Sequence, residues 1–318
     1  MGTDRARERS AAVKPRMAVA LFGPEGRGSF NESGLQGALR ARAAGHELAV
    51  HWIAPAEPSG RADALRRLCR EGMDLLVAHG GQGDAPVAEI CVEFPDTRFA
   101  ITQGSHLSSN TACYEVLQEQ SAFLAGVLAG LASGTRVVGH LSGEKVRPGL
   151  KGRAAFAHGV RAAAPDCRFV TAFCGHQHDP ERAYRTALAL QREGADIVFA
   201  MIDGGRDGVN QACRETPLRQ IGNVLDWVAR DPKVFVASAV ADSGLGVTAA
   251  IEEFAAGRFV PGTRKSQGLE SPESVRLVMS PELRATFGQT IDRWRERLIA
   301  GAVVPADTYE GPELDIPS

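Results

Sequence analysis

MAVALFGPEGRGSFNESG, residues 17–34, decides the fold class. Its apolar first part predicts a buried strand, its glycines predict a tight turn, and the polar residues that follow predict the start of a helix. The first turn of a helix directs free backbone N–H groups outward at the positive end of the helix dipole. Ser29 and Asn31 add side-chain donors and acceptors there, so the turn is predicted to bind a ligand, with close packing as the alternative role of the glycines.

The first part of the chain alternates short apolar runs with helix-like stretches. The expected strands are Met17–Phe22, Leu48–Ile53, Leu75–His79 and Phe99–Gln103. The expected helices are Phe30–Ala44, Arg61–Glu71 and Ala85–Glu93. This alternation predicts parallel βαβ units. A long amphipathic helix is expected next, over Tyr114–Ala132, with small residues such as Gly126 that allow close packing on a sheet.

A second series of the same kind follows. Its expected strands are Val137–Leu141, Phe169–Phe173, Ile197–Ile202, Arg219–Ile221 and Val234–Val240. Its expected helices are Gly152–Ala163, Pro180–Glu193, Gly208–Glu215, Gly244–Ala256 and Pro281–Ala300. We therefore predict an α/β protein with two doubly wound parallel-sheet lobes around a ligand cleft. The expected division is a disordered head at 1–16, a first lobe of 17–132 plus 238–268, and a second lobe of 133–237 plus 269–318.

Composition narrows the functional classes. The 318 residues carry a formal net charge of −2, which argues against a nucleic-acid surface. The six cysteines show no Cys-x-x-Cys pair, a usage that favours a reducing compartment. Residues 1–14 contain no apolar leader, and no run of about 18 apolar residues occurs later. As written, the chain is expected neither to be exported nor to span a membrane; removal of a leader segment is the alternative.

Several motifs, in their order along the chain, carry a family resemblance. They are Gly28–Asn31, Glu93–Phe99, Glu119–Gly126, Gly204–Val209, Ile221–Gly222 followed by Asp226, and Ile251 through Phe259. Together they resemble the basic membrane protein group of solute-binding proteins, the purine-nucleoside-receptor-like receptors of ABC importers. The resemblance runs from about Met17 to Pro305.

The resemblance implies a type I periplasmic-binding fold that closes by a hinge on a purine nucleoside, nucleobase or related small polar solute and leaves it unchanged. It implies an ABC permease as partner and no cofactor. It also implies an extracytoplasmic location, either periplasmic or membrane-associated; because no signal peptide is recognised in this sequence, a cytoplasmic location stays an alternative. In the matching positions Ser29 and Asn31 would bond the solute, and the Gly204–Arg206 turn would approach its ring, with Asp203 beside it as a further candidate. Asp226 would bond a sugar hydroxyl or a ring donor.

Two departures from the family pattern point to an alternative solute. The acidic residue expected before Ser29 is replaced by Arg27-Gly28, although Glu25 lies close enough to substitute. A lysine that many members carry is Ala241 here, with Asp242 beside it. Arginine pairs with carboxylates and phosphates in bidentate fashion, so Arg27 and Arg206 leave an anionic solute open.

A second candidate turn, His79-Gly80-Gly81-Gln82, follows the third expected strand. Its glycines allow close approach of a ligand, and Gln82 offers both a donor and an acceptor. The imidazole of His79 either bonds a ring nitrogen of the solute or belongs to a tight turn between strand and helix.

Aromatic residues are scarce, so those near expected turns are candidate platforms for a planar solute. They are Phe30, Tyr114 and Trp227. Core packing is the usual role of an aromatic residue, and a ligand role is favoured for Trp227.

Metal and enzyme functions find little support. His176-Gln177-His178-Asp179 contains metal-ligand residue types, but Asp179-Pro180 instead predicts a helix N-cap, so no metal is expected. No dinucleotide fingerprint, phosphate loop or nucleophile elbow follows any expected strand. A solute-binding protein is therefore predicted, and not an enzyme. The alternatives are a cytoplasmic ligand sensor that uses the same fold and an enzyme that acts on a small polar metabolite.

Overall fold

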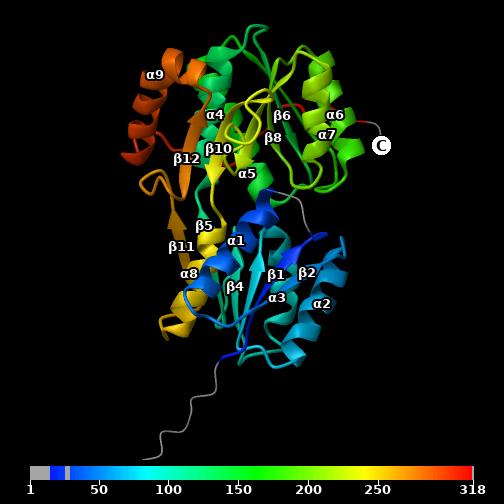
Figure 1. Ribbon diagram of the computed structural model, residues 1–318, viewed down its shortest axis with the longest axis vertical. Helices are drawn as coiled ribbons and strands as arrows, with labels where there is room; N and C mark the ends of the chain where they lie inside the picture. Colours follow the sequence, from blue (N-terminus) through cyan, green and yellow to red (C-terminus); the bar gives the residue numbers. More distant parts are fainter. Residues whose placement is uncertain (1–14, 26–28, 317–318) are drawn as a thin grey trace, which may run out of the picture.

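The computed structural model describes residues 15–25 and 29–316, and they form two α/β lobes, one above the other in Figure 1. Of the predicted head at 1–16 only Pro15 and Arg16 are described, and the backbone N–H of Arg16 donates to Asp74 at 2.7 Å. Arg27 and Gly28, in the first predicted ligand-binding turn, lie outside the described residues.

The first lobe is built on a parallel sheet of six described strands. In spatial order they are β2 (Ala49–Ile53), β1 (Met17–Phe22), β3 (Leu75–His79), β4 (Arg98–Thr102), β5 (Thr111–Val116) and β11 (Arg264–Gln267). Helices α1 (Ser29–Ala43) and α8 (Gly244–Ala255) cover one face, and α2 (Pro58–Arg70) and α3 (Asp84–Ile90) cover the other. Because both faces are covered, β1 is a continuous apolar run that is buried throughout.

The second lobe repeats this plan. Its six described strands are β7 (Arg168–Phe173), β6 (Val137–Ser142), β8 (Ile197–Met201), β9 (Arg219–Val224), β10 (Phe235–Ala241) and β12 (Val275–Met279), of which β12 runs antiparallel to β10. One face packs on α4 (Gln118–Ala132), α5 (Arg147–Ala163) and α9 (Pro281–Ile299). The other face packs on α6 (Pro180–Arg192) and α7 (Arg206–Glu215).

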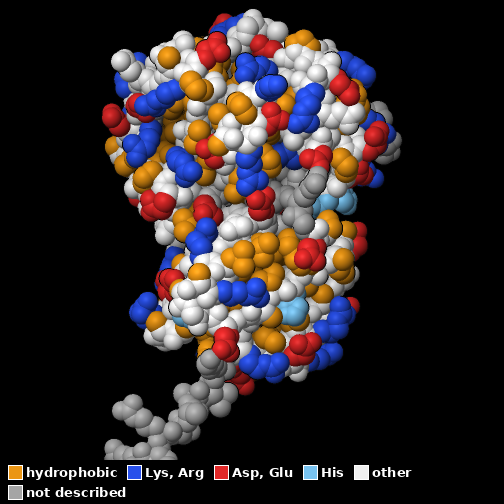
Figure 2. Space-filling model, in the orientation of Figure 1, with side chains coloured by type: hydrophobic (Ala, Val, Ile, Leu, Met, Phe, Trp, Pro, Cys, Tyr) orange, Lys and Arg blue, Asp and Glu red, His pale blue; other side chains and the backbone are white. Residues whose placement is uncertain are grey.

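The described chain crosses between the lobes at three places: between β5 and α4, between β10 and α8, and between β11 and β12. The molecule narrows between the lobes in the space-filling view (Figure 2). The predicted fold class, two doubly wound lobes with parallel sheets, is confirmed.

The predicted helix over Tyr114–Ala132 is wrong in its first part. Thr111–Val116 is the buried strand β5, and the helix begins at Gln118. The expected division also placed this helix in the first lobe, whereas α4 packs on the second. Its surface is apolar on most sides and 11 of its 15 residues are buried, so it needs neighbours all around, which α5, α9 and the second sheet provide.

The second expected boundary between the lobes, at 237/238, also differs from the structure. The boundary at 237/238 would cut β10, which continues to Ala241 as a strand of the second sheet. β11 and β12 were not predicted. β11 is a short and largely exposed edge strand of polar residues, Arg264–Gln267, without the apolar alternation that marks a strand.

Candidate functional site

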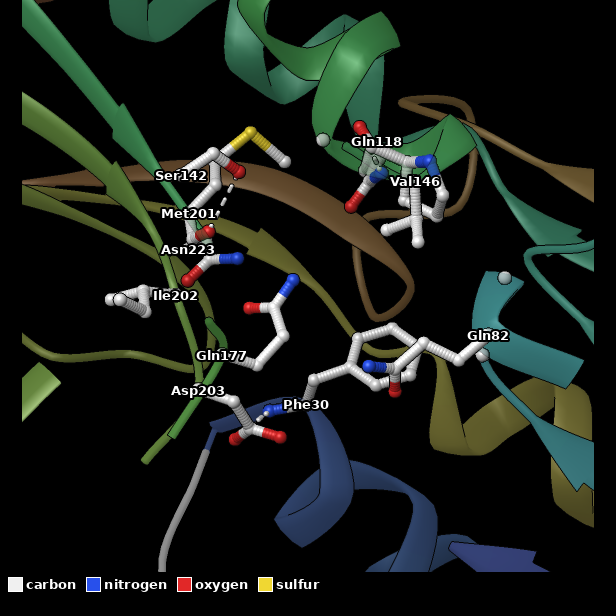
Figure 3. A pocket seen from close by; sticks show the side chains of 14 residues that line it. Phe30, Gln82, Gln118, Ser142, Val146, Gln177, Met201, Ile202, Asp203 and Asn223 are labelled. Carbon is white, nitrogen blue, oxygen red and sulfur yellow. Dashed lines mark hydrogen bonds between the residues drawn. The ribbon is translucent and has the colours of Figure 1, made fainter. Parts of the chain in front are cut away.

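A pocket lies between the lobes, at the carboxyl ends of strands from both sheets (Figure 3). Its empty volume is about 520 Å³, including space that opens to solvent. The first lobe contributes Phe30, Gly80, Gly81 and Gln82. The second lobe contributes, among others, Gln118, Ser142, Gln177, Met201, Asp203 and Asn223. Open parallel sheets bind ligands beyond the carboxyl ends of their strands, so this is the expected place for a ligand.

Phe30, in the first turn of α1, is supported by the buried side chain of His79. The two rings stack 4.3 Å apart, and Nε2 of His79 lies 2.9 Å from the carbonyl oxygen of Phe30. Because a carbonyl only accepts, Nε2 carries the proton, and Nδ1 accepts from the Thr102 hydroxyl at 2.9 Å. The same hydroxyl oxygen accepts the N–H of Gly80 at 3.0 Å. Both ring nitrogens of His79 are therefore bonded within the protein, and burial lowers its pKa to about 4, which keeps the ring neutral.

Asp203 follows β8 in the second lobe, and its carboxylate reaches the N-terminus of α1 in the first. One carboxylate oxygen accepts the backbone N–H of Phe30 at 3.3 Å, and the backbone N–H of Asn31 bonds it as well. Since the first N–H groups of a helix have no partner within it, this carboxylate caps α1 from across the pocket. Burial raises the pKa of Asp203 to about 7, although the two N–H groups and the nearby Arg206 favour its charged form.

Carboxamides make up much of the polar lining. They are Gln82, Gln118, Gln177 and Asn223. Only Gln82 was a predicted site residue; its Nε2 donates across the cleft to Glu144 at 3.0 Å. The missed residues had a positional signal: Asn223 lies in β9 just beyond the predicted end of that strand, and Gln177 follows β7 within the motif considered for metal.

Arg206, the first residue of α7, is 3% exposed and does not line the pocket. Its guanidinium donates to the carbonyl of Ile202 at 2.7 Å and to Oδ1 of Asn223. The ring of Trp227 lies 4.7 Å from it. The charge of Arg206 is therefore used inside the second lobe, and the anionic alternative would rest on Arg27, which is outside the described residues.

Three other predicted residues also lie away from the lining. Asp226 accepts the backbone N–H three residues further on, at 3.2 Å. The ring of Trp227 stacks on Phe235 at 5.4 Å. Tyr114 lies in β5, and its hydroxyl donates to Glu253 at 2.6 Å. Each of these side chains has a local structural partner in place of a position on the pocket wall.

The predicted residues of the first turn are only partly described. Ser29 begins α1, but its side chain is outside the described part, and Glu25 is exposed. Asn31 is buried, and its side-chain amide donates to the carbonyl of Phe22 at 2.9 Å. This bond connects the end of β1 to α1. The Asn31 side chain therefore has a structural role, and it is the backbone N–H groups of Phe30 and Asn31 that donate to Asp203.

Asp242 lies in the crossing segment between β10 and α8. Its carboxylate accepts from the Ser33 hydroxyl at 2.8 Å and pairs with Arg40 at 3.1 Å, both on α1. Asp242 therefore fixes a connection between the lobes, and it is not among the residues that line the pocket.

The segment His176–Asp179 is organised by hydrogen bonds. Asp179 accepts the backbone N–H of Arg182 at 3.0 Å, which confirms the predicted N-cap of α6. Nδ1 of His178 accepts the N–H of Gly204, another predicted site residue, at 3.4 Å. Within residues 15–25 and 29–316 no group of three or more His, Cys, Asp or Glu residues is placed to hold a metal ion.

The chemistry of the pocket is that of a neutral polar site. Asp203 is the charged residue type among the described lining residues, and the others are amides, a hydroxyl, glycines and apolar side chains. Phe30 contributes an aromatic ring that stacks on His79, and Met201 adds apolar surface. An apolar wall with a few fixed polar groups is typical of a site for a small uncharged molecule.

The sequence was compared with protein families and with curated proteins. A family model described as ABC transporter substrate-binding protein PnrA-like (Bmp) matches residues 15–308. Transcriptional activator protein Med of Bacillus subtilis is 26% identical over 164 residues, 52% of this chain and 51% of that protein. A purine-binding protein of Brucella abortus is 22% identical over 189 residues, 59% of this chain and 53% of that protein. The chain thus spans about half the length of these curated relatives.

Solved structures share the two-lobed fold over nearly the whole chain. An ABC transporter solute-binding protein from Aeropyrum pernix has a TM-score of 0.80 and 19% identity, with 94% of each chain covered. A transcriptional activator of the comK gene from Bacillus halodurans has a TM-score of 0.69 and 18% identity, with 88% of this chain and 98% of that one covered. In the part of the chain that the structure describes, no helix has the length and apolar character needed to cross a membrane.

Proposed function

This chain belongs to the Bmp family of PnrA-like ABC transporter substrate-binding proteins, and we propose that it captures a small uncharged polar solute between its lobes and passes it on chemically unchanged. A purine nucleoside or nucleobase is the first candidate solute. The family resemblance drawn from the motifs is confirmed by the match over residues 15–308.

The observation that carries the proposal is the shared lining of the pocket. Phe30 and Gln82 come from the first lobe, and Gln177, Asp203 and Asn223 come from the second. A solute that contacts both sets stabilises the closed arrangement over any open one, because it gains all of its contacts only when the lobes are together. Binding and closure are then one event.

The purine assignment is supported by the flat face of Phe30 and by the relative from Brucella abortus. Stacking on an aromatic ring suits a planar heterocycle, and amides supply hydrogen bonds along its edge. The lysine that many family members carry is Ala241 here, which removes one expected contact with the solute. We therefore propose a class of solute, purine nucleosides and nucleobases, and not one particular compound.

The test is a thermal-shift screen of the whole protein against nucleosides, nucleobases, sugars and small carboxylates. A bound solute at about 100 times its Kd adds about 2.7 kcal/mol to the free energy of unfolding, which moves Tm by a few degrees. A shift with purines that is lost in Phe30→Ala supports the proposal. Shifts with carboxylates alone, or a purine shift that Phe30→Ala leaves intact, contradict it.

The same proposal predicts the partner protein and the cellular location of this chain. A solute-binding protein of this family serves an ABC permease, and we expect this chain to dock there on the extracytoplasmic side of the membrane. Loss of radiolabelled solute uptake on deletion of its gene, with uptake restored by the gene, tests this role.

A ligand sensor is the second candidate, because Med of Bacillus subtilis and the comK activator of Bacillus halodurans share sequence or fold with this chain. In that case the same solute would bind, while its uptake would not depend on the gene. Transcript levels compared with and without the solute, in the presence and absence of the gene, distinguish the two candidates.

A further inference from the structure

Two carboxamides of the pocket, Asn223 and Gln118, have orientations that their protein partners dictate. An amide has an acceptor end, C=O, and a donor end, NH₂, which are distinguished by the hydrogen bonds they make. A guanidinium can only donate, and a carbonyl can only accept. An amide bonded to either has one end fixed, and its other end is left for a ligand.

Asn223 is fixed by Arg206. The guanidinium donates to Oδ1 of Asn223, so the NH₂ group is the end that faces away from Arg206, and Figure 3 shows it directed into the pocket. Arg206 itself is held by Gln220 at 2.9 Å and by the carbonyl of Ile202 at 2.7 Å. The indole N–H of Trp227 donates to the backbone carbonyl of Asn223 at 3.0 Å, which fixes the main chain as well.

The backbone next to Asn223 also indicates that this residue is held in a fixed position. Val224 has a φ of 68°, in the left-handed region that a β-branched residue rarely adopts. Such strain persists where surrounding contacts hold the chain in place. The bonds from Arg206 and Trp227 provide that hold at Asn223.

Gln118 has the opposite polarity. Its Nε2 donates to the carbonyl of Pro148 at 3.0 Å, so the amide oxygen is the free end, and Figure 3 shows it directed toward the pocket. The pocket therefore presents a donor at Asn223 and an acceptor at Gln118.

We propose that the pocket selects its solute by hydrogen-bond polarity, taking an acceptor atom against Asn223 and a donor group against Gln118, with Arg206 as the positioning residue that sets the Asn223 amide. The inference rests on the proposed function, because it needs a solute in this pocket. It goes further by assigning the acceptor and donor sides of that solute.

The decisive variant is Asn223→Asp. It keeps an oxygen for Arg206 and replaces the NH₂ donor by an acceptor of nearly the same shape. Inosine and adenosine are the probes, since they share a sugar but differ in donor and acceptor along one edge of the ring. The proposed polarity favours inosine, whose ring carbonyl accepts and whose adjacent ring N–H donates. We expect Asn223→Asp to raise the Kd of inosine at least tenfold or to reverse the preference from inosine to adenosine. Kd values within twofold of wild type for both would overturn the proposal.

The control is Gln289→Glu, which adds the same charge at an exposed position of α9 outside the pocket; its Kd values should match wild type. A second arm needs no ligand. Asn223→Asp should keep the Tm of wild type or raise it, because a carboxylate still pairs with Arg206, while Asn223→Leu should lower it. Equal losses of Tm in both variants would show that Arg206 does not bond this side chain. If neither nucleoside binds wild-type protein, the purine proposal fails and this arm still decides the amide orientation.

Discussion

Glu32 of α1 and Arg230 of the second lobe form a two-bond ion pair across the cleft, with N–O distances of 2.7 and 3.1 Å. The Arg230 guanidinium also lies 5.1 Å from the Trp227 ring, and that ring packs on Arg206. The pair thus joins the first lobe to the cluster that orients Asn223. Both partners are partly exposed, with side-chain exposures of 29% and 45%.

Glu32→Gln should weaken solute binding only modestly. Exposed ion pairs contribute about 1 kcal/mol or less, which corresponds to about fivefold in Kd. Calorimetry at low and high salt should show the difference from wild type shrinking as salt rises. Glu282→Gln, at an exposed position of α9, is the matched control; a large, salt-independent loss in Glu32→Gln alone would contradict this estimate.

Asp203 should give the protein a distinctive pH dependence. Its pKa is raised from 3.8 to about 7 by burial, so the folded protein holds this proton more tightly than the unfolded chain. The stability that it contributes is fully present below pH 4 and is lost as pH rises to about 7. Relative to wild type, Asp203→Asn should therefore gain stability across this window, by an amount on the order of a few kcal/mol.

The comparison of two proteins is needed because buried histidines act in the opposite direction. Burial lowers the pKa of His79 to about 4, of His140 to about 3, and of His178 below its usual value. These groups remove stability at low pH, but equally in both proteins, so they cancel in the difference. Tm measured against pH for wild type and Asp203→Asn is the test, and parallel curves would refute the assignment.

Phe30 should contribute through its ring. Loss of one aromatic–base stack costs about 1 to 3 kcal/mol, so Phe30→Ala should raise the Kd of a purine probe by about fivefold to 150-fold. Phe30→Leu keeps apolar volume without a π face and should fall between Phe30→Ala and wild type. Equal Kd values for wild type and Phe30→Leu would show that apolar contact alone, without stacking, is what the residue supplies.

Much of the fold could be predicted because buried parallel strands are apolar runs, as in Met17–Phe22 and Leu75–His79. The end of β5, Tyr114–Val116, was misassigned to a helix because β5 runs into α4 with only Leu117 between them, and no turn residue marks the boundary. Arg264–Gln267 could not be recognised, since this edge strand is defined by main-chain pairing with β5 and not by an apolar pattern.

The site was predictable at the level of turns and less so at the level of side chains. Gly80, Gln82 and Asp203, candidates because they follow predicted strands, line the pocket, and so does Phe30, which was not one of the predicted site residues. Which side chain at a turn points to the ligand depends on contacts between distant segments. Arg206, for example, points into the second lobe because its guanidinium donates to Gln220 and to the carbonyl of Ile202 and lies over the Trp227 ring.

Gly126→Ala should destabilise the second lobe without changing the pocket. The sequence predicts close packing of this glycine on a sheet, whereas in the structure the close approach is against α5. A Cβ at 126 would overlap the carbonyl oxygen of Phe156, and a Cβ at Gly159 would overlap that of Phe123. Backbone cannot yield as a side chain does, so we expect a loss of about 1 to 3 kcal/mol or more in the free energy of unfolding from urea titration.

Gly134→Ala is the matched control for that experiment. A Cβ there would meet only Asp196, at 3.5 Å, and Gly134 does not have the positive φ that would strain an alanine. Its stability should stay within about 0.5 kcal/mol of wild type or rise slightly. Because α4 begins at the lining residue Gln118 and meets α5 at Gly126, two turns further on, folded Gly126→Ala should bind solute with wild-type Kd. Unchanged stability in Gly126→Ala would mean that α4 and α5 lie further apart than the structure places them.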